Sequence, residues 1–188
     1  EPMPLEAISG VEAETDLLDG LVEKGLARQA DSENYDVHDL VREFLTRSMN
    51  ESLRQELHAN ASVWYRSRGG SAAERIEYIH HLNESGDTDG LAEVLTAEGH
   101  NLVSAGHTEL LGILRPLERE GYGPRSWCVI KELRGDILSI QGRWDEAEAE
   151  YDGAVALARR HKMSKVLARL LSARADIAVK RGAMDDAL

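Results

Sequence analysis

Glycine-led turns recur along this chain and constrain its fold more than any other feature. They stand at residues 86–89, 106–109, 142–145 and 182–185, and amphipathic stretches lie between them. Glycine directly after a run of periodic apolar residues is typical of a helix C-terminus. The last two turns begin near-copies, Gly-x-Trp-Asp-Glu-Ala at 142–147 and Gly-x-Met-Asp-Asp-Ala at 182–187. From residue 86 onward the chain is therefore predicted to form successive helix pairs.

Composition agrees with a predominantly all-α fold. Only four of the 188 residues are proline and 5% are aromatic, while Ala and Leu are abundant. Ala and Leu are strong helix formers, and proline is the residue that most disrupts helices. We therefore predict an α-solenoid of helix pairs.

Residues 127–188 resemble tetratricopeptide repeats, whose helix pairs are joined by a glycine turn and packed through small residues. The matching positions are a close-contact glycine, a turn glycine with a large apolar neighbour, and small and aromatic residues of the second helix: Gly135, Gly142, Trp144, Ala147, Tyr151 and Ala154, with Gly182 and Ala187 in the next copy. The resemblance implies that Trp144, Ala147, Tyr151 and Ala154 are largely buried. The second copy is cut at residue 188, so we expect the chain to be a piece of a longer one.

The front of the chain has a different pattern. A helix is predicted from Thr15, because Leu17, Leu18, Leu21 and Val22 share one face. A polar turn at residues 30–34 and a strand at residues 35–37 follow, and then a helix over residues 40–49. Helix, two-stranded hairpin and helix form the back half of a winged helix. His38 and Asp39 stand at the last junction, where Asp39 is well placed to cap the new helix.

Residues 35–45 resemble the MHD motif that closes the winged-helix domain of STAND-class signalling ATPases, the NB-ARC and maltose-regulon-activator relatives, with Val37 in place of Met. The resemblance implies that His38, with Asp39, senses the phosphates of ADP bound by an upstream domain and holds the protein off. A helix-start histidine bonded only to backbone is the alternative reading. Two further segments look like the same families: Leu57-His58 followed by Trp64-Tyr65, and residues 77–87.

These segments define three predicted domains: a partial winged helix at 1–49, a helical linker at 50–126, and tetratricopeptide-like repeats at 127–188. No Gly-x-x-x-x-Gly-Lys-Ser/Thr loop is present. We therefore expect no enzymatic activity and no cofactor in this chain, with ADP or ATP bound by the full-length protein. Glu77-x-x-His80 lacks the second such pair that a di-iron site needs, so no metal is expected.

Charge argues against nucleic acid as a partner of this chain. The net charge is −12, and the acidic excess lies in residues 1–126, since residues 127–188 carry 11 Lys and Arg against 10 Asp and Glu. The predicted helix before the hairpin has Asp16, Asp19 and Glu23 against Lys24, whereas a DNA-reading helix is usually basic. The single cysteine, Cys128, and the lack of a long apolar run predict a cytoplasmic protein without membrane contact.

The sequence favours a sensor and interaction part of a STAND-type regulatory ATPase, a transcriptional or signalling regulator. Its repeats would bind a protein or a small-molecule inducer, and the winged helix would relay the nucleotide state of an upstream domain in cis. The alternatives are a stand-alone tetratricopeptide scaffold without a nucleotide switch and a DNA-binding winged helix with a dimerising repeat tail. The basic run at 159–165 is expected to be the loop between two repeats.

Overall fold

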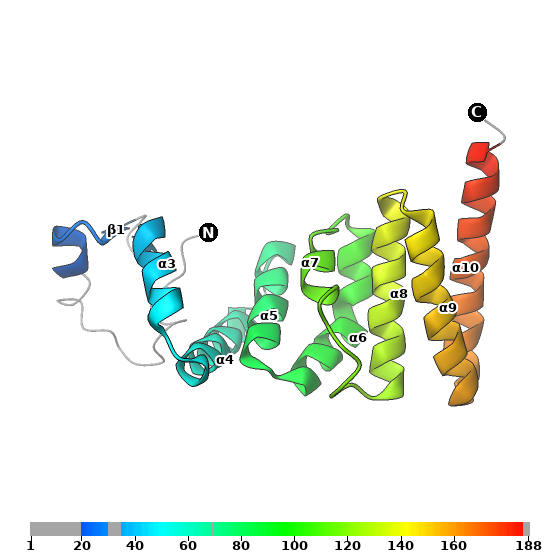
Figure 1. The fold of residues 1–188 in the computed structure, drawn as a ribbon, viewed down its shortest axis with the longest axis horizontal. Coiled ribbons are helices and arrows are strands. Elements are labelled where there is room, and N and C mark those ends of the chain that lie inside the picture. The colour runs from blue at the N-terminus through cyan, green and yellow to red at the C-terminus, as the bar shows by residue number, and fades with distance from the viewer. Residues whose placement is uncertain (1–19, 30–34, 69, 186–188) are drawn as a thin grey trace. The chain divides into compact units, whose positions relative to one another are not determined.

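The computed structural model describes residues 20–29, 35–68 and 70–185. Over these residues the chain is mostly α-helical, with one short antiparallel β-hairpin (Figure 1), so the predicted fold class is confirmed. The chain divides into two compact units, residues 1–87 and 88–188. The division falls inside the predicted linker.

The first unit contains the hairpin and three helices that follow it. Residues 20–23 are helical, and Gly25 turns the chain with a φ of +68°. The elements are β1 (Ala27–Gln29), β2 (Tyr35–Val37), α3 (Asp39–Ser48), α4 (Glu51–Arg68) and α5 (Ala72–Ser85). In the hairpin Ala27 pairs with Val37 and Arg28 with Asp36. The strand predicted at residues 35–37 is present, whereas residues 15–19 and the turn at 30–34 lie outside the described residues.

Helices α4 and α5 pack against each other and form the helical body of this unit. A capping box starts α5: the Ser71 hydroxyl accepts from the Glu74 N–H, and the Glu74 carboxylate accepts from the Ser71 N–H. Gly86 ends it in the left-handed conformation. Ala61, Ile79 and Leu82 are buried between the helices.

The second unit is a row of helices. They are α6 (Thr88–Ser104), α7 (Leu110–Leu114), α8 (Pro124–Ile140), α9 (Trp144–Arg160) and α10 (Ser164–Asp185). Helix α8 packs against α6 and α9, and α9 packs against α10. Figure 1 shows α8, α9 and α10 side by side with alternating directions. The core is apolar, and Ile130, Leu133, Ile137 and Leu170 are fully buried.

Three of the four predicted glycine turns are present. Gly86, Gly106 and Gly142 have φ values of +78°, +97° and +72°. The residue after each glycine donates its N–H to the carbonyl five residues earlier, which closes the preceding helix. The turn predicted at Gly182 is not formed, because α10 continues through it to Asp185.

The turn between α9 and α10 uses Lys162 instead of glycine. Lys162 has a φ of +53°, and the Met163 N–H donates to the Ala158 carbonyl in the same pattern as at the glycine turns. The basic run at 159–165 therefore contains this turn, but residues 159–160 still belong to α9 and residues 164–165 to α10, so the connection is shorter than predicted.

We predict that Gly135→Ala destabilises the second unit. A Cβ on Gly135 would lie 2.7 Å from Cε2 of Tyr151, and this ring is 2% exposed and cannot easily move away. We expect a loss of about 1–3 kcal/mol in the free energy of unfolding, measured by urea unfolding followed by circular dichroism. Gly112→Ala in α7 is the control, because its Cβ meets nothing within 4 Å. Equal stability of the two variants would contradict the close packing of α8 on α9.

Candidate functional site

The junction between β2 and α3 holds the two residues that the sequence predicts as a phosphate sensor. The backbone N–H of His38 donates to the Leu26 carbonyl at 3.3 Å, which extends the hairpin by one bond. The His38 carbonyl accepts from the N–H groups of Val41 and Arg42, both at 2.9 Å, which starts α3. Hairpin and helix therefore both fix the backbone of His38, while its side chain is exposed.

The His38 imidazole has one nitrogen engaged by its own helix. The Leu40 N–H donates to Nδ1 at 3.4 Å. Because Nδ1 accepts this bond, the neutral ring carries its proton on Nε2. His38 can therefore satisfy an N–H of the first helical turn and still offer Nε2–H as a hydrogen-bond donor to an anion.

Asp39 does not cap α3, contrary to the prediction from sequence. His38 occupies the cap position, because its backbone is still bonded to the hairpin and its own Nδ1 accepts the N–H that a cap would take. Asp39 is the first helical residue, with its side chain 92% exposed and 3.3 Å from Arg42 Nη1. A carboxylate in the first turn still stabilises the positive end of the helix dipole.

An open pocket of about 270 Å³ lies beside His38, lined by Gly25, Ala27, Arg28, Asp36, Val37, His38 and Asp39. The Asp36 carboxylate binds two guanidinium groups, with Arg28 Nη2 at 2.9 Å from one oxygen and Arg42 Nη2 at 2.9 Å from the other. The hydrogen bonds from Arg28 lower the pKa of Asp36. Two arginines thus balance the carboxylates of Asp36 and Asp39, and the pocket joins charges of both signs with one imidazole donor.

Sequence reasoning missed the arginines and Asp36 at this site. Arg28 and Asp36 are cross-strand partners in the hairpin. Opposite charges at paired positions stabilise a two-stranded sheet. The hairpin register was the signal that could have found this pair.

The residues predicted to pack the repeat are mostly buried as expected. Ala147 and Ala154 have no exposed surface, Tyr151 is almost fully buried, and Gly135 lies against its ring. Trp144 is less buried than the other three, because it is the first residue of α9 and lies beside the exposed Gly142 turn. Ala187 lies outside the described residues.

A polar network around the buried residues Glu132 and Tyr151 joins four helices of the second unit, and sequence reasoning did not single it out. His100 on α6 lies 3.3 Å from Asp136 through Nδ1 and 3.6 Å from Glu132 through Nε2, both on α8. Arg169 on α10 donates to Glu132 at 2.6 Å. The Tyr151 hydroxyl on α9 donates to Asp136. Each carboxylate therefore has a partner on α6 and a partner on a later helix.

The pKa values in this network follow from the pairing. The close pairing with the carboxylates of Asp136 and then of Glu132 raises the pKa of His100 to about 9. Burial, followed by the bond to Asp136, raises the pKa of Tyr151. At neutral pH, His100 and Arg169 are therefore positive and face two negative carboxylates, and the network holds its helices together without net charge.

No three His, Cys, Asp or Glu side chains among the described residues are arranged as a metal-ligand set. In the same part of the chain, no helix has the length and apolar character needed to cross a bilayer. Neither protein-family models, curated proteins nor solved structures give a match to this chain.

We predict that His100 makes the second unit less stable in base. Its pKa in the folded state lies above the ordinary 6.5, so the folded state holds the proton more tightly. Its contribution is fully present below about pH 6.5 and is lost as the pH rises through about 9. Urea unfolding at pH 6.5, 8 and 9.5 should show a fall in the free energy of unfolding of the wild type with rising pH, and this fall should be missing in His100→Gln.

His161→Gln is the matched control, since His161 is exposed at the α9–α10 turn. It should keep the wild-type pH dependence. The same loss in base in His100→Gln as in the wild type would show that another group carries it.

Proposed function

We propose that this chain is the sensor-and-relay part of a STAND-type regulatory ATPase that controls transcription or signalling. Its repeats bind a protein or a small-molecule inducer, and the helical linker connects them to the hairpin and α3. His38 reads the nucleotide state of an upstream domain of the same polypeptide. The observation that carries the proposal is the position of His38, exposed at the hairpin–helix junction with Nδ1 engaged and Nε2–H as donor.

The site fits a phosphate oxygen in one respect above all. A phosphate accepts hydrogen bonds, and the Nδ1 bond to Leu40 fixes the proton on the other nitrogen, which faces away from the helix backbone. The start of α3 adds the positive end of a ten-residue helix. Bound ADP would supply the negative charge, and His38 would donate a hydrogen bond from Nε2–H to one of its phosphate oxygens.

The other two family-like segments support the same reading because they contact each other. One lies on α4 and contains His58, and the other lies on α5 and contains His81. The Nδ1 atoms of these two residues are 2.8 Å apart. The resemblance thus rests on segments that form one packed helix pair rather than on scattered matches.

The relay requires two states that nucleotide and inducer bind with different affinities. In the off state the hydrogen bond of His38 to the nucleotide favours the ADP-bound arrangement. Inducer bound at the repeats favours the other. Each ligand then weakens the binding of the other by the same factor.

The alternative is a stand-alone tetratricopeptide scaffold, which the close packing of Gly135 on Tyr151 would serve equally well. The sequence of the full gene distinguishes these two functions. The proposal requires a phosphate-binding loop about 200–300 residues upstream, the size of one or two domains. A full gene without this loop would favour the stand-alone scaffold.

We predict no binding of duplex DNA, which argues against the third reading, a DNA-binding winged helix. The net charge is −12, and residues 15–24 are acidic. Even true DNA-binding proteins bind non-specific duplex with dissociation constants of only about 10⁻⁴–10⁻⁶ M at physiological salt. A gel shift at low micromolar protein that is lost on mutating Lys24 and Arg28 would contradict this prediction.

We predict that His38→Ser in the full-length protein speeds ADP release and raises basal activity. Serine is a good helix cap, so the start of α3 is kept while the imidazole donor is lost. A hydrogen bond to a charged oxygen contributes about 1.5–3 kcal/mol, which corresponds to at least about ten-fold in affinity. The measurement is ADP dissociation from wild type and variant side by side.

Glu43→Gln is the matched control, because it neutralises an exposed carboxylate of α3 that does not line the pocket and leaves the imidazole in place. It should release ADP at a rate close to wild type. Equal rates for His38→Ser and wild type would return His38 to a purely structural role. The 188-residue chain itself should bind ADP negligibly, since it has no phosphate-binding loop.

A further inference from the structure

A direct contact between two imidazoles joins α4 to α5. His58 Nδ1 lies 2.8 Å from His81 Nδ1, and the two ring centroids are 5.0 Å apart. His81 is 3% exposed, and the ring of Tyr65 on α4 stacks on it at 5.3 Å. His81 therefore lies inside the helix interface, and the partly buried His58 contacts it there.

This contact depends on the protonation of the two rings. One Nδ1 must carry a hydrogen and the other must accept it, so at least one ring has to be neutral. When both rings are protonated, two N–H groups and two positive charges face each other at hydrogen-bond distance. The bond is then replaced by a repulsion that the buried surroundings do not screen.

His81 has a second reason to stay neutral. Its Nε2 atom is buried and has no hydrogen-bond partner. Protonation would place a charged N–H group there without an acceptor, which is costly away from water. The surroundings of His81 thus resist its protonation at both ring nitrogens.

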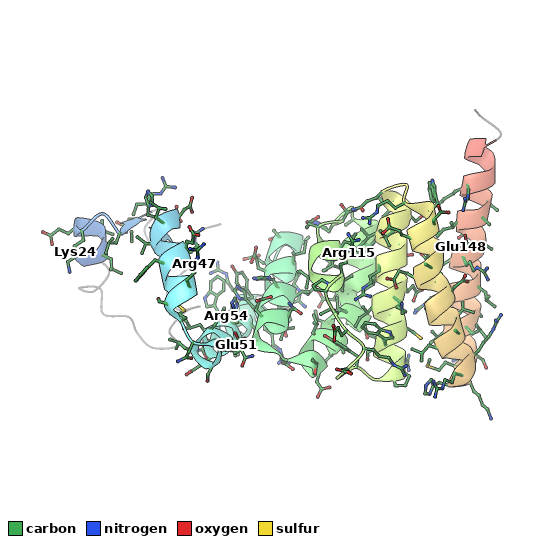
Figure 2. All side chains as sticks on the ribbon, in the orientation of Figure 1. Lys24, Arg47, Glu51, Arg54, Arg115 and Glu148 are labelled. Atoms are coloured by element: carbon green, nitrogen blue, oxygen red, sulfur yellow. The ribbon has the colours of Figure 1, made fainter. Side chains whose placement is uncertain are left out.

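The charged and titratable groups around the pair come from both helices. His80 on α5 places a third imidazole 5.7 Å from His58 and 5.3 Å from His81. Arg54 on α4, paired with Glu51 in the first turn of that helix (Figure 2), also disfavours a positive charge on His58, whereas Glu84 on α5 favours it. The carboxylate of Glu84 therefore favours protonation of His58, whereas Arg54 and the two neighbouring imidazoles disfavour it.

Burial is the largest effect on both rings. It lowers the pKa of His58 and, together with the charges of His58 and His80, lowers the pKa of His81 to about 4. The folded state therefore binds fewer protons than the unfolded chain. The contribution of the pair is present above about pH 6.5 and is lost as the pH falls towards 4.

We infer that His58 and His81 form an acid-sensitive latch that holds α4 on α5 while the rings are neutral and releases the two helices when acid protonates both. Release would expose Ala61, Tyr65 and Leu82, which the closed pair buries. The latch is a property of the first unit and does not depend on the proposed nucleotide switch.

The test uses the full 188-residue chain and two measurements. Histidine ¹H–¹³C NMR between pH 4 and 8 follows the rings, whose signals are assigned with single His58→Gln and His81→Phe variants. Both rings should titrate below 6.5, with coupled curves because they interact. Urea unfolding over the same range follows the stability of the first unit.

The decisive variant is the double change His58→Leu with His81→Phe. It removes both titratable imidazoles and keeps an aromatic ring for Tyr65 to stack on. Because it replaces both hydrogen-bond partners at once, its effect on the free energy of unfolding is expected to be small. Between pH 6.5 and 5 the unfolding equilibrium constant of the wild type should rise about ten-fold or more relative to the double variant. His107→Gln, which changes a histidine of the other unit, should behave as wild type.

Two results would overturn the latch. One is titration of both rings at the ordinary value near 6.5. The other is a double variant that loses as much stability in acid as the wild type. If the double variant does not fold, the ring titration in the wild type decides alone.

Discussion

The second unit depends on the close approach of α8 and α9 at Gly135. The absence of a side chain there lets the ring of Tyr151 lie against the α8 backbone, at a distance that a Cβ would forbid. The ring in turn reaches Asp136, one residue along α8, through its hydroxyl. Asp136 is then held in position to pair with His100 on α6. One missing methyl group thus determines both the packing of a helix pair and the polar network beside it.

The same helix is fixed on another side by Arg134. Its guanidinium is buried and donates to the carbonyls of Leu114 and Leu117, at 3.0 and 2.6 Å, which closes the C-terminal end of the short helix α7. It also lies over the ring of Trp127 and 3.6 Å from Glu150 on α9. Burial lowers the pKa of this arginine, but the carbonyls and the carboxylate compensate the positive charge. Three consecutive residues of α8, from 134 to 136, therefore contact three different helices, α7, α9 and α6.

What the sequence predicted well is local or periodic. The helix pairs, the glycine turns at 86, 106 and 142, and the small residues of α9 follow from spacing, because a left-handed turn needs glycine and a close contact needs a small side chain. The turn at Lys162 was not readable, since an L residue adopts that conformation only when the surrounding helices impose it. The network of His100 was also out of reach, because its paired residues lie 15 to 37 positions apart along the chain. His38 was placed at the right junction, but only the bond from the Leu40 N–H to its Nδ1 shows that it, rather than Asp39, caps the helix.

The two units contain histidines whose pKa values shift in opposite directions, because His81 is buried beside other imidazoles whereas His100 is paired with carboxylates. In the second unit His100 faces two carboxylates, so its protonated form is favoured. In the first unit His81 faces two imidazoles and an apolar interior, so its neutral form is favoured. Titration of His81 therefore lowers the stability of the first unit in acid, and titration of His100 lowers that of the second unit in base. Near pH 7 each ring has the protonation state that its surroundings favour, so both histidines contribute to stability there.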